Sequence, residues 1–160
     1  MAKLISEDKE VITTIELVFL KDKLKDKKYF SWIPYKLLLH SGDRFLIYEK
    51  LENDSGAGDY VFSLKPVNEV QNLVDGIKNF LLNEDKSTFL FEPLEPSFEI
   101  LFERSHKGFS VHLWIDAGNV ISDHYTWDGF GVRFFTAKKN INSFIEELLL
   151  EKDICQKEKI

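Results

Sequence analysis

The sequence predicts an α+β domain in which a mostly antiparallel, meandering sheet carries two amphipathic helices. Three observations support this. Several segments alternate apolar and polar residues, short turn sequences join them, and two segments repeat apolar residues every three or four positions. Short turns favour antiparallel pairing, because parallel neighbours need long crossovers. The order of strands, helix, strands, helix can be read as two similar β-rich halves, each closed by a helix.

In the first half, residues 11–20 are β-branched and apolar and predict a strand. A hairpin is predicted where residues 35–40 and 45–51 flank the turn Ser41-Gly42-Asp43. The first helix is predicted at about residues 67–83. Its apolar stripe consists of Val67, Val70, Val74, Ile77 and Leu81.

In the second half, residues 98–103, 111–116 and 130–134 alternate apolar with other residues, which predicts three strands. The turn signals Gly118-Asn119 and Asp128-Gly129 predict a further strand between them, at residues 120–126.

The closing helix is predicted at about residues 138–151. Its stripe consists of Ile141, Phe144, Ile145, Leu148 and Leu149.

A length of 160 residues fits a single domain covering residues 1–160. The charged ends, at about residues 1–9 and 152–160, are expected to fray. The single cysteine, Cys155, cannot form a disulfide within the chain. The N-terminal sequence lacks the apolar run of a signal peptide, and no apolar segment approaches the roughly 20 residues that span a bilayer. We therefore expect a cytoplasmic protein that does not enter the membrane.

The net charge of −6 disfavours binding to nucleic acid or to anionic membranes, since both require a surplus of Lys and Arg. It is compatible with a basic protein partner. The sequence contains neither a G-x-S-x-G elbow nor a phosphate-binding loop, and Cys155 has no His or Asn near it in sequence. These observations predict a protein that is not an enzyme and binds no cofactor or metal ion.

One alternative reading is a small hydrolase or metal-binding domain that uses His112, Asp116 and His124. Such residues can ligate Zn²⁺ or transfer protons, although their spacing matches no metal signature. If residues 109–116 and 120–126 form a hairpin, His124 can lie opposite His112.

The clearest charge asymmetry is acidic, because residues 84–103 hold six carboxylates and only one basic residue, Lys86. Strand alternation turns part of these carboxylates, together with large apolar residues, away from the core. Aromatic anchors within a charged rim are typical of a protein-binding surface. The predicted partner-binding residues are Glu95, Glu99, Leu101, Glu103, Trp114, Asp116 and Phe135. The alternative is that a helix or a curled sheet buries them.

The layout of residues 12–150 resembles the WapI-type family of bacterial immunity proteins. The likeness rests on the first helix, whose sequence at 67–77 is VNEVQNLVDGI, on the acidic segment FLFEPLEPSF at 89–98, and on the closing helix at 141–150. The resemblance implies a cytoplasmic antitoxin that binds the C-terminal domain of a polymorphic toxin, often a nuclease. It carries no binding motif that can be transferred residue by residue.

Overall fold

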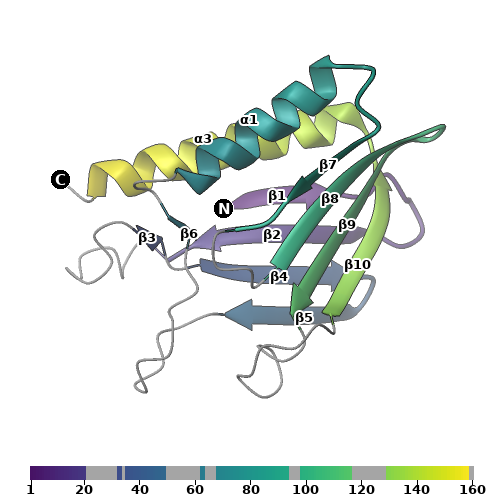
Figure 1. Ribbon diagram of the computed structural model, residues 1–160. Coiled ribbons are helices and arrows are strands. Elements are labelled where there is room, and N and C mark those ends of the chain that lie inside the picture. Colours follow the sequence, from purple (N-terminus) through teal and green to yellow (C-terminus); the bar gives the residue numbers. More distant parts are fainter. Residues whose placement is uncertain are drawn as a thin grey trace.

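The computed structural model describes residues 1–20, 32–33, 35–49, 62–63, 68–93, 98–116 and 129–158. Two four-stranded antiparallel sheets and two helices form an α+β fold, which confirms the predicted class (Figure 1). The first sheet has the order β1-β2-β4-β5. Its strands are β1 (Ala2–Ile5), β2 (Thr13–Phe19), β4 (Tyr35–Ser41) and β5 (Arg44–Glu49).

The second sheet has the order β10-β9-β8-β7. Its strands are β7 (Thr88–Phe91), β8 (Phe98–Ser105), β9 (Gly108–Asp116) and β10 (Gly129–Thr136). A short pair joins β3 (Trp32–Ile33) to β6 (Phe62–Ser63). The helices are α1 (Glu69–Leu82) and α3 (Lys138–Glu158). Each four-stranded sheet is therefore followed by one helix, as the division into two β-rich halves predicts.

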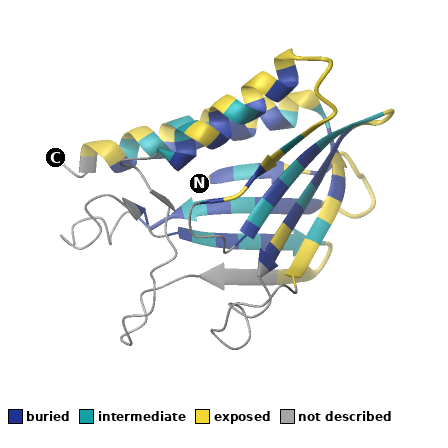
Figure 2. Cartoon of the chain, viewed as in Figure 1, coloured by how far each residue is buried: buried dark blue, intermediate teal, exposed yellow. Residues whose placement is uncertain are grey.

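The two helices lie side by side, with α1 beside the edge strand β7 of the second sheet and α3 beside the edge strand β1 of the first (Figure 1). The strands alternate buried with more exposed residues, and the buried sides join the helices in one hydrophobic cluster (Figure 2). Tyr35 of the first sheet packs edge-on against Phe98 of the second, with ring centroids 5.6 Å apart. Phe80 of α1 packs against Phe102 and Phe109, at 6.4 and 5.7 Å. The sheets and helices thus share one core.

The hairpin predicted around residues 41–43 is confirmed as β4 and β5. Gly42 adopts a φ of +58°, which a glycine tolerates without steric cost. The predicted first helix is also confirmed, with boundaries within two residues. Its N-terminus is capped by Asn68, whose side-chain oxygen accepts from the backbone N–H of Gln71 at 3.1 Å.

Both predicted frayed segments contain regular secondary structure within the described residues. Residues 2–5 form β1, and the backbone N–H of Lys3 donates to the Glu147 carboxylate of α3 at 2.6 Å. At the other end, α3 continues to Glu158 and Cys155 is completely buried. The N-terminal segment also meets the second sheet, because the backbone N–H of Glu7 donates to the Phe135 carbonyl at 2.9 Å.

The predicted pairing of residues 109–116 with residues 120–126 is wrong. Strand β9 lies between β8 and β10, and His112 has Leu101 opposite it on one side and Arg133 on the other. The expected strand at 120–126, with His124, lies outside the described residues, as does the turn Gly118-Asn119. Within the described ranges, neither helix is long and apolar enough to cross a lipid bilayer.

Arg104 of β8 fastens the C-terminal end of α1. Its guanidinium donates to the carbonyls of Phe80 at 2.6 Å, Asn83 at 3.1 Å and Lys86 at 2.9 Å, and lies 5.0 Å from the centre of the Phe80 ring. The last turn of α1 contains no basic residue of its own. A cation from the neighbouring strand therefore satisfies carbonyls that the helix leaves without partners.

We expect Arg104→Met to lower the free energy of unfolding by about 2 kcal/mol, because it removes charge-assisted hydrogen bonds while keeping the aliphatic stem. Urea denaturation measures the change. Lys107→Met, at an exposed position in the next turn, should change the midpoint little. Equal stability of the Arg104 variant and wild type would contradict the capping role.

Candidate protein-binding face

The outer face of the second sheet, defined as the side turned away from the core, is built from alternate residues of four strands. The strand register arranges them in rows that run across the sheet. One row is Thr88, Glu103, Ser110 and Phe135, and the next is Leu90, Leu101, His112 and Arg133. A third row is Glu99, Trp114 and Gly131.

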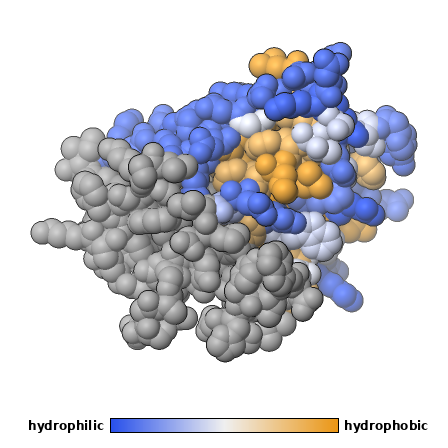
Figure 3. Space-filling model, in the orientation of Figure 1, coloured by the Kyte–Doolittle hydropathy of each residue, from blue (hydrophilic) through white to orange (hydrophobic). Residues whose placement is uncertain are grey.

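Three large apolar side chains are exposed on this face. Leu90 is 49%, Trp114 42% and Phe135 43% exposed. Figure 3 shows an apolar patch over β7 and β8, surrounded by hydrophilic side chains. Scattered single apolar residues are normal on a surface, whereas a group of them with a polar rim indicates an interaction site.

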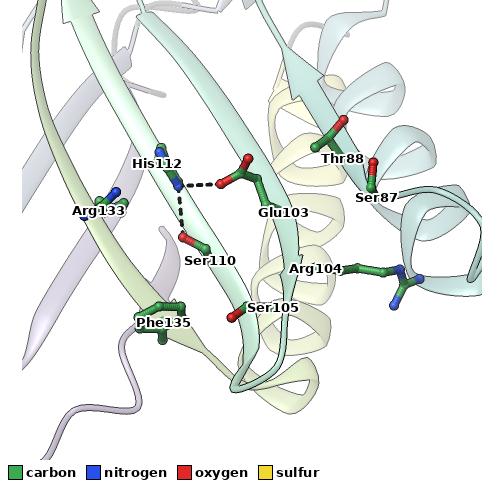
Figure 4. A pocket seen from close by; sticks show the side chains of 9 residues that line it. All are labelled: Ser87, Thr88, Glu103, Arg104, Ser105, Ser110, His112, Arg133 and Phe135. Carbon is green, nitrogen blue, oxygen red and sulfur yellow. Dashed lines mark hydrogen bonds and ion pairs between the residues drawn. The ribbon is translucent and has the colours of Figure 1, made fainter.

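A polar hollow of about 560 Å³ lies beside this patch, with His112 in its floor (Figure 4). The Nε2 atom of His112 lies 2.9 Å from the Glu103 Oε2 and 2.9 Å from the Ser110 Oγ. Arg133 lies across from His112 on β10, and Phe135 lies across from Ser110. Arg104 also lines the hollow, but its guanidinium points towards α1 (Figure 4).

The contacts of His112 do not form a proton relay. In a Ser-His-acid triad the serine and the carboxylate contact different ring nitrogens, so that one nitrogen takes the proton while the other holds the ring. Here both oxygens contact Nε2. This arrangement orients His112 and does not activate Ser110 as a nucleophile.

The same strand geometry separates His112 from Asp116. They are four residues apart on β9, and a strand rises about 3.3 Å per residue, so their Cα atoms are about 13 Å apart. In the part of the chain that the structure describes, no three His, Cys, Asp or Glu residues come together as a metal site.

Charge is unevenly distributed on the outer face. Glu103 pairs with His112, and the ammonium of Lys107 lies 5.9 Å from the centre of the Phe135 ring. The cationic group of Lys107 therefore lies at the end near the β8–β9 turn. The opposite end carries Glu99 and Glu92, which lies directly after β7.

Partial burial raises the pKa of the Glu99 carboxyl above its usual value, and the charge and hydrogen bond of Glu92 raise it further. Neither Glu92 nor Glu99 forms an ion pair with another described residue. Among the described residues, these two carboxylates therefore have no cationic partner.

We expect Glu99→Gln to make the fold more stable at neutral pH. Because the folded pKa of Glu99 is raised, the folded state keeps a proton that the unfolded chain loses, so stability falls as pH rises from the unfolded pKa through the folded pKa. Glutamine removes this loss. Thermal melts should show a higher Tm for the variant at pH 7, and the difference should shrink below about pH 4. If the Tm of the variant depends on pH in the same way as the Tm of the wild type, the Glu99 carboxylate does not destabilise the fold at neutral pH.

Five of the seven predicted partner-binding residues lie on the outer face: Glu99, Leu101, Glu103, Trp114 and Phe135. Glu95 lies outside the described residues, and Asp116 is described only as the last residue of β9. No element in the described ranges buries Trp114 or Phe135, both of which are exposed.

Sequence reasoning missed Leu90 and Glu92, which extend the face onto β7. It also missed the role of Gly131, which provides space for the Trp114 ring. The alternation of residues 88–92 could have revealed Leu90 and Glu92. The role of Gly131 depends on the register between β9 and β10.

Comparison of the chain with models of protein families, with curated proteins and with solved structures finds no match in any of the three.

Proposed function

We propose that this chain is an immunity protein that binds the toxic C-terminal domain of a polymorphic toxin and blocks it, using the outer face of the second sheet. The observation that carries the proposal is the group of exposed apolar side chains on that face, Leu90, Trp114 and Phe135. Large exposed anchors on a rigid sheet are typical of protein interfaces, where Trp contributes disproportionately to affinity. The resemblance to WapI-type immunity proteins supports the same function.

The charge distribution supports a basic partner. The chain carries a net charge of −6, and Glu92 and Glu99 place two carboxyl groups at one end of the face. A nuclease domain must present Lys and Arg to nucleic acid. An acidic protein face that covers such a surface excludes the nucleic acid and is attracted to the domain at long range.

The proposal predicts that a large secreted protein with a variable C-terminal domain is encoded next to this chain, and the test uses that C-terminal domain. That domain is purified, its activity is assayed, and this chain is titrated in. Inhibition should be complete at one molar equivalent, because occlusion consumes one immunity protein per toxin. An active toxin domain that keeps full activity with this chain in excess would refute the proposal.

The same titration distinguishes the alternative of a hydrolase or metal-binding enzyme that uses His112, Asp116 and His124. An enzyme that inactivates the toxin turns over, so inhibition would be complete well below one equivalent and would increase with time. It would also disappear in His112→Ala. The contacts of His112 with Glu103 and Ser110 are the only feature of the described site that favours this alternative, and both contacts use one nitrogen.

A further inference from the structure

Strand β10 forms an edge of the second sheet, where β9 is its one neighbour in the strand order (Figure 1). In an antiparallel pair, successive residues direct their N–H and C=O groups alternately to the paired strand and away from it. The Phe135 carbonyl accepts from the backbone N–H of Glu7, so it points away from β9. By alternation, the backbone groups of Arg133, Gly131 and Gly129 also point to the open edge.

The turn between β8 and β9 gives the same alternation independently. Ser105 and Gly108 flank a two-residue turn and pair with each other, which is where such a hairpin forms its first bonds. Every second residue from Gly108 onwards therefore bonds β8, and the residues between them, such as Leu113, bond β10. Leu113 lies opposite Val132. The even-numbered residues of β10 thus bond β9 and the odd-numbered residues face the edge.

The N-terminal segment covers only the last part of this edge. The Thr136 hydroxyl donates to the Ile5 carbonyl at 2.6 Å, and the Glu7 N–H donates to the Phe135 carbonyl at 2.9 Å. Residues 5–7 therefore run antiparallel to β10. At Asp8 the chain turns away, and the Asp8 carboxylate accepts two backbone N–H groups of that turn. Among the described residues, no further strand continues the line that residues 5–7 begin.

The rest of the edge is open to solvent. Gly129 and Gly131 are exposed, and because glycine has no side chain their exposed atoms belong to the backbone. Phe130 shares the core-facing side of β10 with the buried Phe134, yet it is 47% exposed. The core-facing layer therefore ends one strand short of covering Phe130. Strand β10 also lacks the proline and lysine that often prevent pairing at an edge.

Two outer-face positions determine which side chains an added strand can carry. A Cβ atom at Gly131 would lie 2.6 Å from Cε3 and 2.9 Å from Cδ2 of Trp114, so the indole occupies the space above this glycine. The indole is 42% exposed. A large apolar side chain opposite Gly131 would pack against it, because aromatic rings cover glycines of neighbouring strands. Opposite the exposed Arg133, an acidic side chain forms a favourable cross-strand pair.

We propose that β10 receives an extended segment of the toxin as an added antiparallel strand. The segment carries an acidic residue opposite Arg133 and, two residues later, a large apolar residue opposite Gly131. Backbone hydrogen bonds supply affinity in this mode, and alternate side chains supply specificity. The inference rests on the proposed function for the source of the segment. A second copy of this chain fits less well, because β10 contains no acidic residue to place opposite Arg133.

The test uses a peptide of sequence Ser-Glu-Val-Leu-Val-Ser with an acetylated N-terminus and an amidated C-terminus. Its Glu and Leu should bond the edge, whereas its two Val should direct their N–H groups away from it. N-methylation of the Glu and the Leu should therefore abolish binding, and N-methylation of both Val should leave it nearly unchanged. Exchanging the Glu and the Leu in the sequence tests the antiparallel direction and should weaken binding.

Binding is followed by NMR through the backbone amides of Gly131 and Arg133. In the free protein, these two amides should exchange with solvent faster than those of Val132 and Phe134, which bond β9. The peptide should shift their signals saturably and slow their exchange. If all four amides exchange equally slowly in dilute protein, the edge is already closed and the inference is wrong.

Variants of Arg133 test the side-chain preference and the backbone separately. Arg133→Glu should weaken binding of the peptide about fivefold and strengthen binding of a peptide with Lys in place of Glu by a similar factor. Arg133→Pro removes the outward N–H without removing a bond to β9, and should abolish binding of both peptides. Arg133→Ala is its control, because it keeps the N–H and should bind weakly. Melting curves show which variants are folded, and the N-methylated peptides test the same edge on the unaltered protein.

Three results would overturn the inference. The first is equal binding of the two N-methylated peptides, and the second is wild-type affinity in folded Arg133→Glu and Arg133→Pro. The third is protection of the Gly131 and Arg133 amides that increases with protein concentration, which would assign the edge to a second copy of this chain.

The outcomes also separate this inference from the proposed function. If the toxin is neutralised at one equivalent but the peptides do not bind the edge, the function stands and strand addition is refuted. If the peptides bind with the expected discrimination but no toxin is neutralised, the edge stands as a strand-binding site and the proposed function is refuted.

Discussion

Phe144→Ala should lower the free energy of unfolding by about 3–5 kcal/mol, the loss expected when a buried Phe is removed from a core that cannot fully collapse. Phe144 is completely buried on α3 and belongs to the hydrophobic cluster that joins both sheets and both helices. Urea denaturation followed by circular dichroism measures the change.

The matched control is Leu150→Ala on the same helix. Leu150 is 61% exposed, so its truncation should change stability by less than about 0.5 kcal/mol. The pair compares two apolar truncations on one helix that differ in burial. If Phe144→Ala leaves the midpoint at the wild-type value, α3 does not dock on the sheets as the structure shows.

Helix α3 also shows where sequence periodicity was sufficient and where it was not. The stripe from Ile141 to Leu148 predicted the helix correctly. The buried positions then continue through Glu151 to Cys155, at the same spacing of three to four residues. The charge of Glu151 concealed this continuation, and only the fold supplies its ion-pair partner, the amino group of Met1.

Strand β1 was missed for a different reason. Four residues are too short for alternation to be recognised, and their stability comes from contacts distant in sequence, with β2 and α3. The hairpin β4–β5 was predictable because its turn is local and contains the glycine it needs. Local sequence signals therefore predicted the hairpin, whereas the edge strand β1 depends on contacts between residues that are far apart in the sequence.

The same distinction applies to the candidate binding face. Alternation along each strand predicted that five residues face away from the core: Glu99, Leu101, Glu103, Trp114 and Phe135. The neighbours across the strands follow from register, which one strand's sequence does not contain. Register places His112 diagonally from Glu103, within 2.9 Å of its carboxylate, and places Glu99 opposite Trp114. The sequence showed that this part of the chain is rich in carboxylates. It did not show that Glu99 lies opposite the aromatic residue Trp114.

Kinetics of toxin binding should separate the two contributions of this face. Glu99→Gln with Glu103→Gln should lower the association rate roughly three- to tenfold at low salt, because exposed carboxylates attract a basic partner before contact. Glu103 already contacts the Nε2 of His112 at 2.9 Å, so the single variants Glu99→Gln and Glu103→Gln should be measured as well. The effect should fade as salt rises, because exposed charges are screened over about 8–10 Å at physiological ionic strength.

Trp114→Ala should act on dissociation instead. An aromatic anchor covered by a partner contributes about 2 kcal/mol or more, which corresponds to a dissociation rate roughly 30-fold faster with little change in association. Surface plasmon resonance over a series of salt concentrations measures both rates. The control for charge is Glu146→Gln with Asp153→Asn, two exposed carboxylates of α3, a helix that packs against β1 and α1. A melting curve for each variant confirms that it is folded. If folded variants of Glu99, Glu103 and Trp114 bind with wild-type rates at low salt, the toxin docks on another surface, because a face that neither attracts nor anchors the partner cannot be its binding site.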